Sequence, residues 1–184
     1  MKYTWLQYDD VLTKQQCKQI IDVGYQIGFE DAKIGTQQDS DYHDPNIRNC
    51  KIASMPFKTM LWLEDLLTNA IAEINNFNFR FDLHGFSDLE VIHYNQGTYF
   101  KRHTDNFIND VEYQRKLTFI FQLTDPDEYV GGDLIVYTHK DAERVSRKQG
   151  SLIVFPSYTM HEVDELLSGT RYSMIGWVMG PEFK

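Results

Sequence analysis

The sequence predicts an α+β fold in which a β-rich core, a barrel or a double-sheet jelly roll, carries two N-terminal helices on one outer face. Two early segments repeat apolar residues at helical spacing, and the second half is a series of short apolar runs between turn residues. No helical pattern alternates with those runs, which argues against a βαβ fold. We expect one domain over residues 1–184, with helical support over about 1–78 and the jelly-roll core over about 79–180.

The two helices are expected over residues 14–27 and 57–75. Thr13 is placed to cap the first helix, and Pro56 directly precedes the second. The first helix should bury one side made of Cys17, Ile20, Ile21 and Gly24. The second should bury a stripe made of Met60, Leu61, Leu63, Leu67, Ile71 and Ile74. The polar stretch 31–48 between the helices is predicted to be a loop, and its length makes it a candidate substrate lid.

Short strands are expected to follow. They cover residues 79–83, 89–94, 116–123, 133–138, 151–155 and 171–178. Glycine, proline and aspartate separate them, as in the Gly131-Gly132 pair. Many short strands at such spacing are typical of a jelly roll or a barrel.

Composition excludes several function classes. The net charge of −9 disfavours a grip on nucleic acid, because phosphate neutralisation needs clustered Lys and Arg. No stretch approaches the roughly 20 apolar residues of a membrane span, and the first residues show no signal-peptide pattern. The two cysteines, Cys17 and Cys50, form no Cys-x-x-Cys pair. We therefore expect a cytoplasmic protein with no nucleic-acid or membrane partner, and the sequence does not indicate its oligomeric state.

Three side chains predict a metal site: His103, Asp105 and His161. Side chains two residues apart on an extended segment point the same way, so one ion can contact both His103 and Asp105. His161 follows a distant apolar strand that a jelly roll can place alongside. Two imidazoles and one carboxylate bind one face of an octahedral ion and leave the other face open, as in non-haem Fe(II) oxygenases.

Other readings of these residues are open. A structural zinc site is normally closed by four ligands. His93 is a candidate for the fourth ligand, but we expect it to be an ordinary core or surface residue. His139 and Asp141 form a second His-x-Asp pair, which we expect in a surface turn. A metal hydrolase would need a general base, and Glu162 should point away from its neighbour His161. A jelly-roll module that keeps a metal for structure or recognition, without catalysis, is a further alternative.

Arg171 lies ten residues after His161 and opens an apolar strand. A buried guanidinium needs a partner, because an unpaired charge in the interior is costly. A carboxylate offers a two-pronged match to it. A surface salt bridge is the alternative role for Arg171, but its place in an apolar strand favours binding of a dicarboxylic co-substrate on the open side of the metal.

The second half of the chain resembles the prolyl 4-hydroxylase-like branch of 2-oxoglutarate oxygenases, and bacterial PKHD-type hydroxylases in particular. The likeness covers roughly residues 88–180. It rests on several segments in the same order, 94–106, 117–134, 150–157 and 161–177, and it is the combination that is specific.

This resemblance implies a double-stranded β-helix core, with Fe(II), 2-oxoglutarate and O2 as cofactor and co-substrates and L-ascorbate as an optional addition. It implies His103, Asp105 and His161 as Fe(II) ligands and catalytic residues, and Arg171 as the partner of the far carboxylate of 2-oxoglutarate. For the remaining site residues it implies co-substrate contacts at Tyr94 and Gln122, and substrate contacts at Trp177, Tyr99 and Arg48.

The chain departs from the family pattern at two places. Gln122 stands where many relatives have a tyrosine, and residues 163–167 lack the usual proline-valine. The implied reaction is hydroxylation of a C–H bond in a prolyl residue of a peptide or protein. A free amino acid or another small molecule remains the alternative substrate. Residues 31–48 and 106–114 are expected to cover the site.

Overall fold

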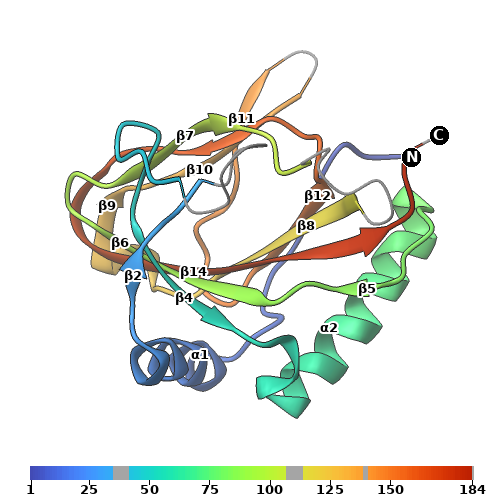
Figure 1. Cartoon of the computed structure of the whole chain (residues 1–184), viewed down its shortest axis with the longest axis horizontal. Coiled ribbons are helices and arrows are strands. Elements are labelled where there is room, and N and C mark those ends of the chain that lie inside the picture. The colour runs from blue at the N-terminus through green and yellow to red at the C-terminus, as the bar shows by residue number, and fades with distance from the viewer. Residues whose placement is uncertain (35–41, 107–113, 139–140, 184) are drawn as a thin grey trace.

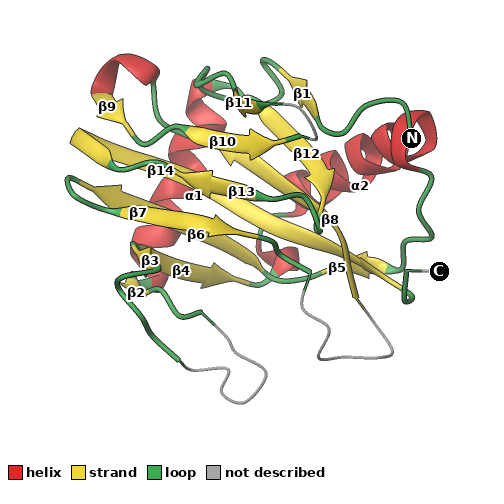
Figure 2. Cartoon of the chain, turned by 90° about the horizontal axis from the view of Figure 1, so that it is seen from above, coloured by secondary structure: helices red, strands yellow, loops and turns green. Residues whose placement is uncertain are grey.

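The structure, a computed structural model, describes residues 1–34, 42–106, 114–138 and 141–183. Within these residues two antiparallel sheets face each other, and two helices lie against the outer side of the larger sheet (Figure 1). Figure 2 shows the strands of the smaller sheet in front and both helices behind. The predicted helices thus lie on one outer face, as expected.

The larger sheet has nine strands among the described residues. Its order is β1 (Leu6–Tyr8), β12 (Leu152–Pro156), β8 (Gln114–Gln122), β14 (Leu166–Gly180), β6 (Leu89–Asn95), β4 (Lys51–Met55) and β2 (Glu30–Asp31). Two short strands also pair with β14, namely β5 (Gly85–Phe86) and β9 (Tyr129–Gly131). The long strand β14 runs through the middle of this sheet, between β8 and β6.

The smaller sheet has five strands within the same described ranges. Its order is β11 (Ala142–Arg144), β10 (Leu134–Tyr137), β13 (His161–Val163), β7 (Tyr99–His103) and β3 (Arg48–Asn49). The indole Nε1 of Trp5 donates to the Glu143 carboxylate at 3.1 Å and ties the edge near β1 to the edge at β11. This contact links the two sheets along one side of the sandwich.

Two apolar layers hold the fold. The inner layer lies between the sheets and takes residues such as Ile120 and Ile175 from the larger sheet and Val136 and Val163 from the smaller one. The outer layer joins the back of the larger sheet to the helices. Two facing antiparallel sheets with a shared inner core make the expected double-stranded β-helix, so this prediction is confirmed.

Helix α1 (Lys14–Ile27) has the predicted bounds and cap. The Thr13 hydroxyl accepts from the backbone of Gln16, whose side chain reaches back to the backbone of Thr13, which makes a capping box. Gly24 lets the helix approach the sheet, because a Cβ there would lie 3.2 Å from a Val91 methyl. The helix ends at Gly28, where φ is +98°.

Helix α2 (Leu61–Ile74) is shorter than predicted. A 3-10 turn (Phe57–Thr59) precedes it and a π-helical turn (Asn75–Phe79) follows it. Its buried stripe is Leu63, Leu67, Ile71 and Ile74, whereas Leu61 is 74% exposed. Both helices have 14 residues, and no helix in the described part of the chain is long and apolar enough to cross a membrane.

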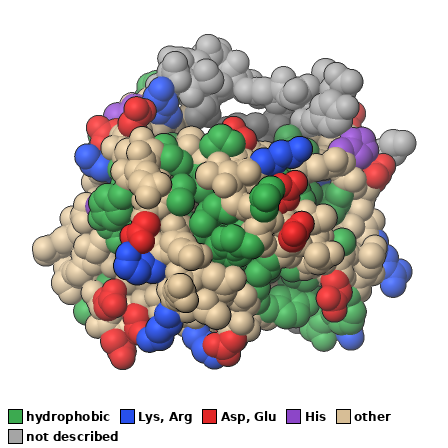
Figure 3. All heavy atoms as spheres, turned by 90° about the horizontal axis from the view of Figure 1, so that it is seen from below, with side chains coloured by type: hydrophobic (Ala, Val, Ile, Leu, Met, Phe, Trp, Pro, Cys, Tyr) green, Lys and Arg blue, Asp and Glu red, His purple; other side chains and the backbone are tan. Residues whose placement is uncertain are grey.

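Figure 3 views the molecule from the side on which these helices lie. Hydrophobic side chains are visible there between Lys, Arg, Asp and Glu side chains of mixed sign.

The predicted strand at 79–83 is wrong. Phe79 completes the π-helical turn, and Arg80 has a left-handed φ of +59° that ends the helix. Asn75 stabilises this exit, because its side-chain amide donates to the Phe81 carbonyl and accepts from the Phe81 N–H, both at 2.9 Å. The apolar residues Phe79 and Phe81 resemble a strand pattern but pack their rings against the core from irregular backbone.

The first third is also less helical than predicted, because β1 to β4 lie within it. The strand β4 pairs with β6 over five residues, from Lys51 opposite His93 to Met55 opposite Leu89. The others are two or three residues long, too short to produce a readable period. The boundary near residue 78 therefore does not separate helices from sheet.

Candidate active site

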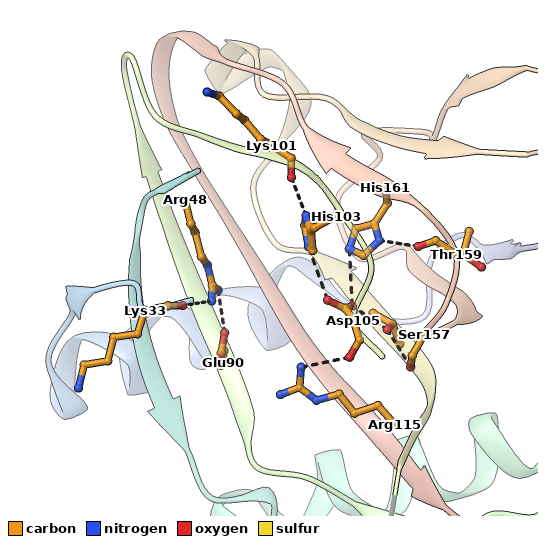
Figure 4. A network of polar contacts seen from close by, with 11 residues as sticks. Lys33, Arg48, Glu90, Lys101, His103, Asp105, Arg115, Ser157, Thr159 and His161 are labelled. Atoms are coloured by element: carbon orange, nitrogen blue, oxygen red, sulfur yellow. Dashed lines mark hydrogen bonds and ion pairs between the residues drawn. The ribbon is translucent and has the colours of Figure 1, made fainter. Parts of the chain in front are cut away.

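The predicted metal ligands meet between the two sheets. His103 ends β7, His161 begins β13, and the two are direct partners in the register of the smaller sheet. Asp105 follows β7, and its backbone N–H donates to the Ser157 carbonyl at 2.8 Å. One ligand atom from each side chain lies within 4.8 Å of the others, and Figure 4 shows the three side chains converging.

A β-bulge aims His103 into the sandwich. Between the pairs His161–His103 and Val163–Phe100 the register shifts, so that β7 has one residue more than β13. The extra residue puts Phe100 and His103 on the same inward side although they are three positions apart. The Phe100 ring then stacks on the His103 imidazole, with ring centroids 3.5 Å apart.

Backbone carbonyls determine the tautomers of both histidines. Nδ1 of His103 lies 2.7 Å from the Lys101 carbonyl, and Nδ1 of His161 lies 2.9 Å from the Thr159 carbonyl. A carbonyl only accepts, so each Nδ1 carries a proton, and in the neutral form of each ring Nε2 is the atom that offers a lone pair. Both Nε2 atoms lie 3.5 Å from the Asp105 carboxylate. This is the orientation that metal-binding histidines need.

Charge at the site also suits a metal. Burial opposes ionisation of Asp105, but His161, His103 and Arg115 outweigh it and hold the pKa of Asp105 well below its usual range. The buried hydroxyl of Thr118 donates to the same carboxylate at 2.8 Å. Burial lowers the pKa of His161, which favours the neutral imidazole that a metal ion needs as a ligand. An ionised carboxylate beside neutral imidazole is a donor set that suits Fe(II).

Arg171 lies in the same cavity, on the inner face of β14, and is only 1% exposed. Its Nη2 donates to the side-chain oxygen of Gln122 at 2.9 Å. Its Nε and Nη1 have no protein partner among the described residues. A buried guanidinium with two unsatisfied nitrogens fits a carboxylate from a bound small molecule.

The other two predicted co-substrate residues surround Arg171. Tyr94 lies opposite Arg171 in the register, and its ring centroid is 5.1 Å from the guanidinium carbon. Burial raises the pKa of Tyr94, so its hydroxyl stays protonated and can donate. Gln122 does not line the cavity; it supports Arg171 from behind.

The cavity has a volume of about 540 Å³. Residues of both sheets line it, and apolar side chains such as Ile92, Ile120 and Ile175 form much of its wall. Trp177 lies on this wall with a buried indole N–H that has no partner among the described residues. The Arg115 guanidinium stacks over the Trp177 ring at 3.5 Å. Trp177 thus lines the cavity, and its contact with a substrate stays a prediction.

Arg48 lines the cavity, but its guanidinium is largely engaged by the protein. It forms an ion pair with Glu90 at 2.8 Å, donates to the Lys33 carbonyl at 3.1 Å and lies 4.8 Å above the Phe100 ring. Burial works against its charge, but Glu90 outweighs burial and raises the pKa of Arg48. Arg48 is thus held through Glu90 beside the ring that stacks on His103.

The structure does not bring Tyr99 into the cavity. Regular alternation would place it on the same side as His103, but the bulge in β7 reverses that relation. Its hydroxyl instead donates to the Pro45 carbonyl at 3.2 Å. The substrate contact predicted for Tyr99 therefore has no support in this geometry.

Three site residues were missed by sequence reasoning: Phe100, Thr118 and Arg115. Thr118 had a readable signal, because it lies four positions before Gln122 on the same strand and so faces the same side. Phe100 had none, since its direction depends on the bulge. Arg115 is placed by contact with Trp177 across two strands, which no local pattern reveals.

Some predictions fall on residues outside the described ranges. The expected lid at 31–48 includes residues 35–41, and the expected cover at 106–114 includes 107–113. Of the described residues in the lid segment, Lys33, Ile34, Ile47 and Arg48 line the cavity. His139 of the second His-x-Asp pair also lies outside the described ranges.

Comparison with known proteins identifies the family. Residues 89–179 match the model of the 2OG-Fe(II) oxygenase superfamily. A PKHD-type hydroxylase of Prochlorococcus marinus is 36% identical over 83 residues, which cover 45% of this chain and 37% of the relative. The chain thus matches less than half the length of that relative. A PKHD-type hydroxylase of Crocosphaera subtropica is 25% identical over 177 residues, which cover 94% of this chain and 77% of the relative.

Solved structures share the fold. A prolyl hydroxylase of Trichoplax adhaerens, in complex with a hypoxia inducible factor peptide fragment, has a TM-score of 0.79 at 20% identity and covers 96% of this chain and 84% of its own. A Pseudomonas putida prolyl-4-hydroxylase has a TM-score of 0.74 at 18% identity, and the match covers 98% of this chain and 94% of that one. With the match over residues 89–179 and the converging His103, Asp105 and His161, the chain belongs to the 2OG-Fe(II) oxygenase superfamily, with a PKHD-like character.

Proposed function

We propose that the chain is an Fe(II)- and 2-oxoglutarate-dependent hydroxylase that acts on a C–H bond of a prolyl residue in a peptide or protein. One observation carries the proposal. The ligand atoms of His103, Asp105 and His161 lie within 4.8 Å of one another, and they share a cavity with the buried, partly unsatisfied guanidinium of Arg171. A metal site and an anion site in one cavity suit a metal-chelating keto acid with a second carboxylate.

His103, Asp105 and His161 would hold Fe(II) from one side. When bound, Fe(II) and 2-oxoglutarate supply the oxidising chemistry, in which one oxygen atom of O2 enters succinate, formed with CO2, and the other enters the substrate C–H bond. Asp105 contributes the negative charge, and the carbonyls of Lys101 and Thr159 keep both imidazoles in the ligating orientation.

Arg171 would bind the far carboxylate of 2-oxoglutarate, and Tyr94 would lie beside it. Both side chains are almost fully buried, so water competes little for this contact. Charge-assisted hydrogen bonds are strongest in such a site. Glu162, the alternative general base of a metal hydrolase, is engaged instead by the Tyr137 hydroxyl, which donates to its carboxylate at 2.6 Å.

A prolyl substrate is supported by the apolar wall and by the fold neighbours. A proline ring is compact and apolar, which suits a wall of isoleucines with Trp177 at its side. The indole N–H of Trp177, without a partner among the described residues, offers a donor to a peptide carbonyl. Both fold neighbours described above are named as prolyl hydroxylases, and one of them is in complex with a peptide.

We further propose that residues 1–184 act as one oxygenase domain in the cytoplasm, with L-ascorbate as an optional reductant. Strands from the first third complete both sheets, which supports a single unit. Both cysteines are buried free thiols, as is usual in a reducing compartment. Fractionation of cells that express the full chain would test the location.

Anaerobic titration tests the cofactor assignment. Adding Fe(II) and 2-oxoglutarate should produce a weak visible metal-to-ligand absorption band, and His103→Ala or Asp105→Ala should abolish the band and turnover. A metal-binding module without catalysis would show no such band. Normal succinate formation by either variant would contradict the assignment.

Mass spectrometry tests the substrate. Proline-containing peptides incubated with the protein, Fe(II), 2-oxoglutarate and O2 should gain one oxygen atom. A parallel incubation with free amino acids separates the small-molecule alternative. Oxygen gain in the free amino acids, with none in the peptides, would refute the peptidyl substrate while preserving the oxygenase.

A further inference from the structure

No described side chain compensates the positive charge of Arg171. Among the described residues it forms no ion pair within 4.0 Å, and its hydrogen-bond partner is the neutral amide of Gln122. Its Nε and Nη1 are buried and have no hydrogen-bond partner in the part of the chain that the structure describes. An unpaired buried charge is unfavourable, so this arrangement costs stability in the free protein. The cost is explained if the charge is kept for an anionic ligand.

Gln122 is held in one orientation. Its side-chain nitrogen donates to the Ser146 carbonyl at 3.3 Å, which leaves the side-chain oxygen facing Arg171. Its backbone is bonded on both sides, from its N–H to the Ser151 carbonyl at 3.1 Å and from the Gly150 N–H to its own carbonyl at 2.8 Å. The residue is 1% exposed. The amide is therefore a rigid support that fixes one end of the guanidinium.

We propose that Gln122 is a positioning residue that sets co-substrate selectivity through Arg171. Its neutral amide orients the guanidinium without neutralising it, so the site favours a 2-oxo acid that carries a second carboxylate. This inference rests on the proposed function, because it concerns the same 2-oxoglutarate site. Gln122 acts through Arg171 and does not itself line the cavity.

The charge of the partner is the critical property. A carboxylate at position 122 would pair with Arg171 in the free protein, and the far carboxylate of 2-oxoglutarate would then add an uncompensated negative charge to a buried site. A 2-oxo acid with an uncharged tail would no longer leave Arg171 unpaired. An apolar side chain of similar length would instead leave all the guanidinium nitrogens without a protein partner and without a fixed orientation.

The test compares Gln122→Glu and Gln122→Met with Gln114→Glu. Gln114 lies at the other end of β8, is 8% exposed, and its side-chain oxygen accepts from the Phe183 N–H at 3.4 Å, so it receives the same substitution away from Arg171. Each protein is loaded with Mn(II), so that binding is measured without turnover. It is then titrated by calorimetry with 2-oxoglutarate and with 2-oxopentanoate. The second compound has the same carbon chain with a methyl in place of the far carboxylate.

In the wild type, 2-oxoglutarate should bind about 100-fold more tightly than 2-oxopentanoate, given the strength of hydrogen bonds to charged groups. Gln122→Glu should weaken 2-oxoglutarate binding about tenfold or more and reduce this affinity ratio to a few-fold, while the Mn(II) affinity stays constant. Gln122→Met should weaken 2-oxoglutarate binding about tenfold and leave the affinity for 2-oxopentanoate unchanged. Gln114→Glu should behave as wild type.

Wild-type selectivity retained in both Gln122 variants, or lost equally in Gln114→Glu, would overturn the role of Gln122. If Gln122→Glu fails to fold or to bind Mn(II), Gln122→Met alone decides, by loss or retention of 2-oxoglutarate affinity. A wild-type protein that binds Mn(II) but not 2-oxoglutarate would overturn the proposed function itself, which separates the two failures.

Discussion

Replacing Thr118 by valine should weaken metal binding without moving any ligand. Thr118 lies in β8, fully buried, between partners in β12 and β14. Its hydroxyl donates to the Asp105 carboxylate at 2.8 Å and lies 3.2 Å from the Ser157 hydroxyl. Valine has nearly the same shape and no hydroxyl, so the change removes the hydrogen bonds to Asp105 and Ser157 but little volume.

The magnitude follows from the charge and burial of the pair. Loss of an outer partner of a metal ligand typically lowers metal affinity about 10- to 100-fold, which is about 1.4–2.7 kcal/mol. A hydrogen bond to a charged group contributes about 1.5–3 kcal/mol to stability, so the metal-free protein should also unfold more easily. Both losses have one cause, because Asp105 is left with one donor fewer in a buried site.

Calorimetric titration with Mn(II) measures the affinity, and urea unfolding measures the stability. Thr124→Val is the matched control, because Thr124 is also buried and its hydroxyl accepts from the Tyr172 N–H at 2.7 Å, remote from the metal ligands. That variant should lose stability and keep its Mn(II) affinity. If Thr118→Val is folded and binds Mn(II) as tightly as Thr124→Val, the supporting role of Thr118 is refuted.

Arg171→Met should abolish tight 2-oxoglutarate binding. The melting temperature of the ligand-free protein should stay equal or rise, because the change removes a buried charge that no described residue compensates. A clear drop in melting temperature would show that Arg171 is structural. Glu90→Gln should lower the free energy of unfolding by about 3 kcal/mol in urea, since it leaves the buried Arg48 without its counter-ion, and a loss near zero would mean that solvent screens the pair. In chelator, the metal-free protein should lose stability as the pH falls below about 6.5, because burial lowers the pKa of His161 and the unfolded chain takes up the proton first. Melting curves of His161→Gln should show a smaller pH slope, with the remainder due to His93, whose pKa burial also lowers; an unchanged slope would contradict this assignment.

Local chemistry was enough for some elements. The capping box at Thr13 begins α1 and the glycine at position 28 ends it, and both signals are local in sequence. The predicted bounds of this helix are those observed. The long apolar runs around β6, β8, β12 and β14 were also located correctly, because central strands of this sheet are buried over most of their length.

Other elements had no local signal. The strands β2 and β3 have two residues each and exist only because β4 and β7 supply their partners. Residues 79–83 imitate a strand because Phe79 and Phe81 alternate with polar residues, but Phe79 ends the π-helical turn and the Asn75 side chain bonds the backbone of Phe81. In both cases the interactions that decide the structure involve residues outside the local apolar pattern.

For this protein the sequence by itself indicated the candidate donor set, since His103, Asp105 and His161 combine ligand chemistry with the spacing that an open metal site needs, and it placed Arg171 at the start of an apolar strand, where the structure buries it. Only the tertiary structure decided which neighbours face them. The bulge in β7 turned Phe100 inward and Tyr99 outward, and the pairing of β14 with β8 set the amide of Gln122 behind the guanidinium. The physical reason is that side-chain chemistry is a property of each residue, whereas direction in a sheet depends on register, which is fixed by strands far apart in the chain.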